Sequence, residues 1–266
     1  MTAPLTFTGR RAFSLVELLV VLAITALLAG MLYPAVERSR MSALTITSTS
    51  NLRQLALANL AYLSENGRYA PADDQSNKKR WHGGRTSVGK PFDPTQGYLS
   101  PYLGGSRAVS LCPVLKQQLT GGGTFEEGTG GYGYNASYVG GTPSWAYNSD
   151  GSRVSARAAD IVLPSTTVMF TSSAYANGDH VQEYPYSEPP FWDFGDGPSG
   201  FRPSPTTHFR FNGKALVAWC DGHVALVAKE TREVGDNPHN GDAVAQQLGW
   251  FGPDEENGFW NPKREP

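Results

Sequence analysis

The longest apolar stretch of the chain lies near its N-terminus. It covers residues 13–33 and contains a single charged side chain, Glu17. A run of this length is enough for an α-helix to cross the hydrocarbon core of a bilayer. Arg10 and Arg11 precede the run and no acidic residue does. The positive-inside rule therefore predicts that residues 1–12 face the cytoplasm and that the rest of the chain lies on the other side of the membrane.

The apolar pattern continues with helical spacing beyond this run. Six apolar side chains fall on one stripe with a period of 3.6 residues. They are Leu44, Leu52, Leu55, Ala56, Leu60 and Leu63. The pattern predicts one helix from about residue 13 to about residue 64, with a weaker Ser/Thr-rich middle at residues 45–50. Asn66 followed by Gly67 supplies the C-terminal stop.

The remainder of the chain has strand and turn patterns. Residues 70–99, with the basic cluster 78–80, predict an exposed loop, and residues 179–205 predict a long insertion. Short strands are expected within residues 132–139 and 166–171. The clearest β signal is the segment 214–228, in which Asp-Gly joins two apolar runs, as in a β-hairpin. Because both faces of these runs are apolar, the hairpin is expected at the centre of the sheet.

These elements predict an α+β fold. A long N-terminal helix packs its C-terminal half on a small antiparallel β-sheet, and long Gly/Pro-rich loops lie outside. The expected organisation is a cytoplasmic leader at residues 1–12, a transmembrane helix at 13–34, an amphipathic stem helix at 35–66 and a globular β-rich domain at 67–266.

Composition excludes several function classes. The chain of 266 residues has 30 glycines and 19 prolines, which agrees with abundant loops, and its formal charge of −2 offers no basic field for nucleic acid. Two cysteines do not make a disulfide scaffold, a zinc ribbon or a thioredoxin-type motif. Catalytic motifs of the G-x-S-x-G or H-E-x-x-H type are absent, and the chain is not expected to be an enzyme.

Other N-terminal signals fit the apolar run less well. A cleavable secretory signal has a shorter apolar core and a small-x-small cleavage site, which this run lacks. A lipoprotein signal requires a cysteine where Met31 stands. An ordinary uncleaved anchor leaves Glu17 unexplained, since an acidic residue within a spanning segment costs about 2.5–3.5 kcal/mol on insertion scales.

The segment 10–21, Arg-Arg-Ala-Phe-Ser-Leu-Val-Glu-Leu-Leu-Val-Val, resembles the class III signal of type IV pilins and type II secretion pseudopilins. The resemblance implies that a prepilin peptidase cleaves between Ala12 and Phe13 and N-methylates Phe13. Family members usually have Gly before the cleaved bond, whereas this chain has Ala12. Pro34 matches a proline that kinks the helix of many pilins.

In such a protein Glu17 acquires a partner. Cleavage leaves an ammonium group at Phe13, and a cation in an apolar environment requires an anion, which Glu17 of the same or a neighbouring subunit supplies. The resemblance further implies a bacterial inner-membrane location with a periplasmic or extracellular domain. Its expected partners are a prepilin peptidase, identical or related pilin subunits in a helical filament, and an inner-membrane assembly platform.

The C-terminal hairpin region resembles the processing-associated H-X9-DG region that accompanies pilin-type signals in some bacterial proteins. Residues 111–113, 132–138 and 163–173 contribute to this looser resemblance. One departure concerns the histidine of the pattern: Phe211 stands nine intervening residues before Asp221, and His208 stands twelve intervening residues before it.

Two groups of side chains are candidate metal ligands. His208, Asp221 and His223 combine imidazoles with a carboxylate, although Asp221 is equally explained by the turn, which favours Asp. Asp193 and Asp196, with Glu188 nearby, offer oxygen ligands for Ca²⁺ in a loop outside the cell, but they match no fixed calcium loop. Ca²⁺ is thus the candidate cofactor, although the expected function of the chain requires no cofactor.

Cys112 and Cys220 are a candidate disulfide, because the globular domain is expected in an oxidising compartment. The alternative is a pair of buried thiols, which the sequence alone does not separate from the bridge.

Three functional hypotheses follow. The first is a pilin-like or pseudopilin subunit that forms a filament. The second is an anchored or filament-tip module that binds polysaccharide or another surface through exposed aromatic residues, among them Trp145, Trp192 and Trp250. The third, a tethered hydrolase, requires a catalytic constellation in a cleft.

Overall fold

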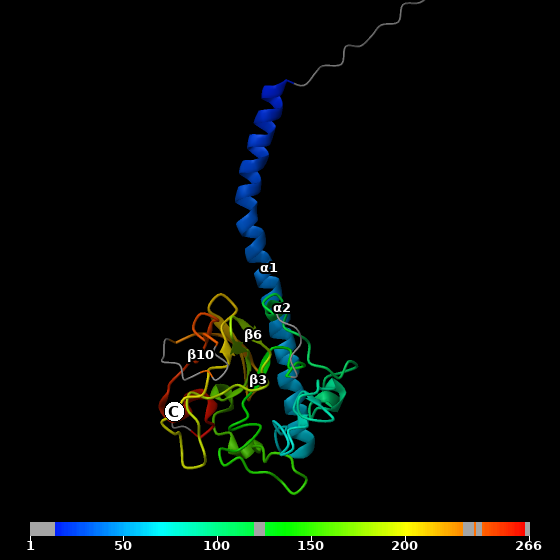
Figure 1. The fold of residues 1–266 in the computed structure, drawn as a ribbon, viewed down its shortest axis with the longest axis vertical. Helices are drawn as coiled ribbons and strands as arrows, with labels where there is room; N and C mark the ends of the chain where they lie inside the picture. Colours follow the sequence, from blue (N-terminus) through cyan, green and yellow to red (C-terminus); the bar gives the residue numbers. More distant parts are fainter. Residues whose placement is uncertain (1–13, 120–125, 231–236, 238–240, 264–266) are drawn as a thin grey trace, which may run out of the picture. The chain divides into compact units, whose positions relative to one another are not determined.

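A computed structural model describes residues 14–119, 126–230, 237 and 241–263 (Figure 1). Contacts divide the chain into two compact units, Met1–Ala43 and Leu44–Pro266. The division falls within the predicted stem helix, because residues 44–66 pack with the globular part of the chain. The structure has an α+β, pilin-like layout, as the sequence predicts.

The first element is the predicted long helix. It is α1, Leu15–Asn66, and it ends where Gly67 adopts a positive φ of 70° and donates its N–H to Leu63 O at 2.8 Å. This is a glycine C-terminal cap. The Ser/Thr-rich stretch is helical, and the hydroxyls of Ser48 and Thr49 donate to carbonyl oxygens one turn earlier.

One face of α1 within the second unit is buried. Its buried residues are Ser48, Leu52, Leu55, Ala56, Ala58 and Asn59. The predicted stripe therefore faces the core, with its centre most deeply covered. Tyr132 Oη donates to Ser48 O at 3.1 Å, and Asn59 Oδ1 accepts the N–H of Ala70 at 2.9 Å.

The main sheet has four antiparallel strands in the order β3-β4-β8-β9. The strands are β3 (Tyr132–Tyr134), β4 (Val168–Ser172), β8 (Lys214–Trp219) and β9 (Val224–Ala228). The predicted hairpin is confirmed as β8–β9, but the prediction that it lies at the centre of the sheet holds for only one of its strands. β8 is interior and buried, whereas β9 is the edge strand and is partly exposed.

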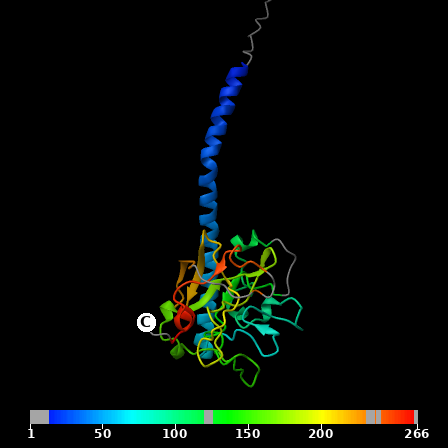
Figure 2. The same cartoon turned by 60° about the vertical axis from the view of Figure 1, so that its left-hand side comes forward.

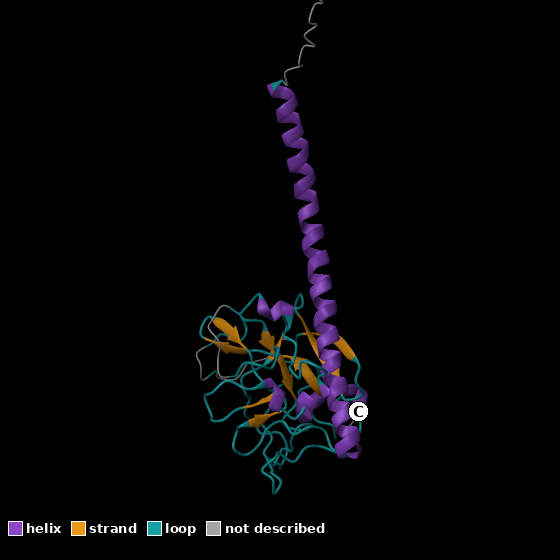
Figure 3. Ribbon diagram, turned by 90° about the vertical axis from the view of Figure 1, so that its right-hand side faces the viewer, coloured by secondary structure: helices purple, strands orange, loops and turns teal. Residues whose placement is uncertain are grey.

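Three two-stranded antiparallel sheets accompany the main sheet. They pair β1 (Lys79–Arg80) with β2 (Gly83–Gly84), β5 (Tyr175–Asn177) with β6 (His180–Gln182), and β7 (Thr207–His208) with β10 (Leu248–Gly249). The short helices are α2 (Pro113–Lys116), η1 (Pro94–Gln96), η2 (Ser100–Tyr102), η3 (Ala158–Asp160), η4 (Pro164–Thr166) and η5 (Glu255–Trp260). Loops join these short elements throughout the second unit (Figure 3).

Aromatic side chains from the end of the chain complete the core. η5 lies beside the sheet, coloured red in Figure 2. Trp250, Phe251 and Trp260 are fully buried and pack in one cluster with Val217 and Trp219 of β8. The C-terminal aromatic segment therefore closes the core over the sheet.

The prediction of an exposed loop at residues 70–99 is wrong. Trp81 and His82 in this segment are fully buried, and the Trp81 indole N–H donates to Pro185 O at 2.8 Å. Arg80 is also buried, where it pairs with Glu126, while Lys78 and Lys79 remain exposed. The polar composition of this segment was misleading, because Arg80 and Trp81 are buried against partners far along the chain, Glu126 and Pro185.

Candidate functional site

The first turn of α1 carries a reciprocal cap between Ser14 and Glu17. The Ser14 N–H donates to Glu17 Oε2 at 2.9 Å, and the Glu17 N–H donates to Ser14 Oγ at 3.2 Å. This arrangement is a capping box, which satisfies two backbone donors that have no partner within the helix. The carboxylate is thus held at the positive end of the helix dipole, next to the peptide unit that follows Phe13.

The side chains beyond this cap form a continuous apolar surface. From Leu15 to Val36 the large apolar side chains are exposed. By length and composition, the helix is long and apolar enough to cross a membrane. Its hydroxyl at Thr25 is satisfied internally by Val21 O at 2.9 Å and Leu22 O at 3.0 Å. Such a surface requires lipid or another apolar surface to cover it.

Pro34 lies inside α1. Because proline has no N–H, the carbonyl of Gly30 loses its usual helical partner at this point. Both residues lie in the exposed, apolar part of the helix, and no heavy atom lies within 4 Å of a Cβ built at Gly30. The predicted cleavage residues Ala12 and Phe13 lie outside the described residues.

The comparisons with known proteins bear on this segment. Residues 8–33 match a family model described as a prokaryotic N-terminal methylation motif. The chain carries a prepilin-type methylation motif. The motif spans Ala12, Phe13 and Glu17 and ends one residue before Pro34. No curated protein and no solved structure matches the chain. The resemblance of the C-terminal region to the H-X9-DG pattern stays a prediction.

The motif and the apolar helix together indicate a membrane-anchored, prepilin-type pilin or pseudopilin. Such a motif implies processing by a peptidase and assembly with other pilin subunits. It indicates a structural subunit rather than an enzyme.

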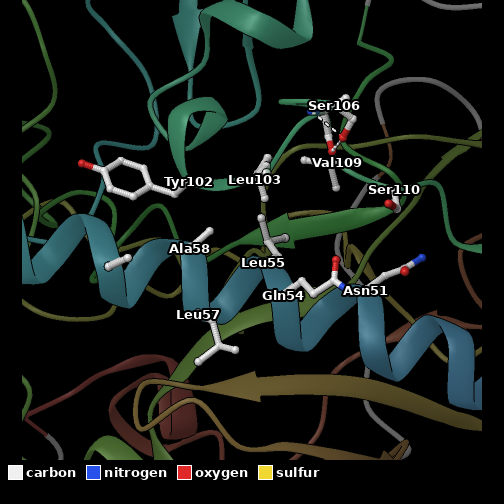
Figure 4. Close-up of a pocket in the computed structure, with 13 residues that line it drawn as sticks. Asn51, Gln54, Leu55, Leu57, Ala58, Tyr102, Leu103, Ser106, Val109 and Ser110 are labelled. Atoms are coloured by element: carbon white, nitrogen blue, oxygen red, sulfur yellow. Dashed lines mark hydrogen bonds between the residues drawn. The ribbon is translucent and has the colours of Figure 1, made fainter.

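A groove runs along the stem part of α1 in the second unit. It has a volume of about 400 Å³ and lies between the helix and the loop at residues 102–110. Leu103, Val109 and Ser110 of the loop lie along one side of the helix (Figure 4). Leu57 also lines the groove and is 56% exposed, so apolar surface of the stem remains available to a neighbour.

The structure does not bring His208 together with the other two predicted ligands. Asp221 and His223 pair with each other at the hairpin turn, with 2.6 Å between Oδ1 and Nδ1. His208 is buried on β7, where Arg210 Nη1 donates to its Nδ1 at 3.1 Å. Burial and the Arg210 charge hold the pKa of His208 well below its ordinary value. Asp221 is therefore accounted for by the turn.

The predicted calcium ligands lie in different environments. Asp193 is buried and accepts hydrogen bonds from Tyr138 Oη at 2.8 Å and from Gly195 N at 2.9 Å, whereas Asp196 is exposed. Glu188 accepts a hydrogen bond from Tyr184 Oη at 3.1 Å, and burial raises its pKa to about 7. Among the described residues, no group of three or more His, Cys, Asp or Glu side chains has the arrangement of a metal site.

Cys112 and Cys220 are both free and buried, so the candidate disulfide is not formed in this structure. Cys112 Sγ lies 3.4 Å from Ser48 Oγ on the stem. Cys220 lies at the hairpin turn, where a Cβ at Gly222 would be 3.0 Å from Leu60 Cδ1. Leu60 lies twelve positions after Ser48 on the helix, or about 18 Å along the axis, which is more than a disulfide spans.

The aromatic residues of the surface-binding hypothesis are divided. Trp250 is fully buried and its indole N–H donates to Glu188 O at 3.1 Å, so its predicted exposure is wrong. Trp145 is 38% exposed, and its ring centroid lies 6.1 Å from that of the partly exposed Trp192.

Sequence reasoning missed two buried carboxylates that organise the second unit. Glu183 Oε2 accepts from the backbone N–H groups of Gly128, Thr129 and Gly130 and from the Thr129 hydroxyl, at 2.8–3.1 Å. Asp73 pairs with Arg153 at 2.9 Å. Each partner is more than 50 residues away, and nothing in the local sequence marks the pairing. The turn at residues 128–130 thus holds an internal carboxylate.

Proposed function

We propose that this chain is a pilin-like or pseudopilin structural subunit. A prepilin peptidase cleaves it between Ala12 and Phe13 and N-methylates Phe13. The processed subunit sits in the bacterial inner membrane with its bulk outside the cytoplasm. From there an assembly platform adds it to a type II secretion pseudopilus or a type IV pilus-like filament.

The observation that carries the proposal is the methylation motif at the start of a long helix whose N-terminal part is apolar. The geometry of Glu17 supports it. The carboxylate already accepts the N–H of Ser14 in the uncut chain. After cleavage the new ammonium group of Phe13 would lie one residue before the Ser14 N–H that Glu17 already accepts, so the ammonium group and the carboxylate would neutralise each other within the apolar layer.

The exposed apolar face of α1 also supports assembly, because it needs an apolar partner to cover it. Before assembly lipid covers it, and in a filament the helices of neighbouring subunits replace the lipid. In the second unit, the stem groove exposes further apolar surface at Leu57. We propose that neighbouring stems pack in this region.

The proposal is tested by producing the full chain together with a prepilin peptidase and an assembly platform, and by measuring subunits in sheared filaments. Glu17→Gln is expected to leave cleavage intact and to reduce the filament fraction strongly, because the subunit ammonium then lacks its counter-charge. Glu37→Gln, also on an exposed position of α1, is the matched control and is expected to assemble normally. Normal assembly of Glu17→Gln would contradict the proposed role of the carboxylate.

A further inference from the structure

The second unit has a cavity of about 420 Å³ that the proposed filament function does not use. Its polar lining includes Tyr138, Thr142, Asp160, Asp193, Asn261 and Lys263. Its size falls in the range of small-ligand sites, which combine a concave surface with a few fixed polar groups.

Asp193 is a preorganised acceptor in this cavity. Its two carboxylate oxygens accept from Tyr138 Oη and Gly195 N, and Asn257 Nδ2 donates in turn to Tyr138 Oη at 2.8 Å. Asn257 is fully buried and also accepts the N–H of Phe191 at 2.7 Å, which ties down the loop that carries Asp193. Each carboxylate oxygen keeps a lone pair for a further donor.

The two segments that contribute Thr142 and Asp193 to the cavity also carry an aromatic pair, Trp145 and Trp192, although neither ring lines the cavity itself. The turn that contributes Thr142 to the cavity also carries Trp145, whose N–H donates to Thr142 O at 2.9 Å. Trp192 immediately precedes Asp193 in the sequence and packs against Trp145. The Arg153 guanidinium lies 4.2 Å from the Trp145 ring centroid and supports one face of the indole.

The backbone of Trp145 is strained. Its φ is 53°, in the left-handed region that is costly for a bulky side chain. A tryptophan that is 38% exposed contributes less to the core than a buried one, so burial alone does not explain why the fold tolerates this conformation. Strain of this kind is concentrated at ligand-binding positions.

The charges of the lining narrow the ligand class. Asp160 and Asp193 face a single lysine, Lys263, and Asp160 is already paired with Arg157 at 3.0 Å. This balance disfavours phosphate-rich and other anionic ligands. Carboxylate, amide and hydroxyl groups beside an aromatic platform match a sugar, whose hydroxyls donate to polar groups and whose C–H face packs on an indole.

We propose that this cavity binds a neutral saccharide. One face of a sugar ring packs on the Trp145–Trp192 pair, and the ring hydroxyls donate to Asp193 and to the carbonyl oxygen of Asn261. The site goes beyond the filament function and does not depend on it: a subunit that assembles without binding sugar, or binds sugar without assembling, separates the two.

The test uses the full chain in a detergent without a sugar headgroup and isothermal titration with neutral hexasaccharides of glucose, mannose, xylose and N-acetylglucosamine. At least one is expected to bind saturably. Trp145→Gly and Asp193→Asn are expected to raise its Kd about tenfold or more, the equivalent of losing one stacked ring or one charged hydrogen bond. Tyr102→Ala, a half-exposed aromatic on the stem groove, is the control and is expected to leave the Kd unchanged.

Trp145→Gly also separates a binding role from a structural one. Because glycine adopts positive φ without strain, this variant is expected to unfold at the same or a higher urea concentration than the wild type. A clear loss of stability would make Trp145 a structural residue and overturn its assignment. Absence of binding by all four hexasaccharides at millimolar concentration, an unchanged Kd in Trp145→Gly, or self-association that Trp145→Gly abolishes would each overturn the saccharide proposal.

Discussion

At the scale of single residues, carboxylates have different roles according to what surrounds them. Glu17 caps a helix, Glu183 binds a row of backbone N–H groups, and Glu188 has only one hydroxyl donor to its side chain. Burial favours the neutral form of an acid unless hydrogen bonds or charges compensate. The three glutamates are therefore expected to respond differently to pH and to substitution.

The raised pKa of Glu188 should make the free energy of unfolding depend on pH. Its pKa rises from 4.5 to about 7 on folding, so the folded state keeps its proton over a window in which the unfolded state releases it. The free energy of unfolding should fall by up to about 3 kcal/mol from this group as the pH rises from about 4.5 to about 7, and stay level above. Glu188→Gln should remove this loss, so the variant gains stability over the wild type at pH 8 relative to pH 5.

The measurement is urea unfolding of both proteins in detergent, followed by tryptophan fluorescence at the two pH values. The difference between the proteins cancels the contributions of other titrating groups, including the buried His82 and His208, whose pKa values are lowered by burial. An identical pH dependence in the two proteins would show that Glu188 does not titrate in this window.

Removal of the Glu183 carboxylate should destabilise the second unit strongly. Glu183→Ala leaves the N–H groups of Thr129 and Gly130 buried without their acceptor, and we expect a loss of about 3 kcal/mol in the free energy of unfolding. Asp196→Ala removes an exposed carboxylate and is expected to change it by less than about 0.5 kcal/mol. Equal urea midpoints for the two variants would refute the importance of the carboxylate to this loop.

At the scale of elements, the stem helix has a buried face and an exposed face. Leu55 and Leu57 both line the groove, but Leu55 is 1% exposed and packs into the core of the second unit, whereas Leu57 is 56% exposed. The apolar stripe in the sequence locates the first face. It leaves the second unmarked, because Leu57 lies outside the stripe, and the groove that it lines is completed by the loop at residues 102–110, far away in the sequence.

The two leucines form a matched pair of variants. Leu55→Ala should destabilise the second unit by about 3 kcal/mol, because it removes buried volume that the surroundings refill only in part. Leu57→Ala should leave unfolding within about 0.5 kcal/mol of the wild type, yet lower the yield of filaments if neighbouring stems pack there. Urea unfolding and filament yield measured on both variants test this, and a destabilised Leu57→Ala would contradict the division of faces.

The elements that local pattern determines were predictable. α1, its glycine stop and the β8–β9 hairpin follow from periodicity and turn chemistry. The edge position of β9 was not, because strand order depends on which strands pair across long separations. The same limit hid Trp81 and Arg80, which are buried by partners that no local pattern indicates.

At the scale of the whole molecule, the N-terminal site was more predictable than the rest. A processing signal must be read as a linear segment, so the residues from Arg10 to Glu17 carry it in sequence order, and the match over residues 8–33 confirms the motif. The metal and disulfide hypotheses required long-range geometry. His208 is hydrogen-bonded to Arg210 and lies apart from the other two predicted ligands. Cys112 lies beside Ser48 of the stem helix, whereas the turn that follows Cys220 lies beside Leu60, about three turns further along the helix.

In the mature subunit, the apolar helix is expected to begin at a methylated residue 13. The measurement is mass spectrometry of the intact protein and of its N-terminal peptide after extraction from native membranes. We expect a chain that begins at Phe13 and carries one extra methyl group on its N-terminal amine. A chain that begins at Met1, or one cut near residue 30, would contradict the account.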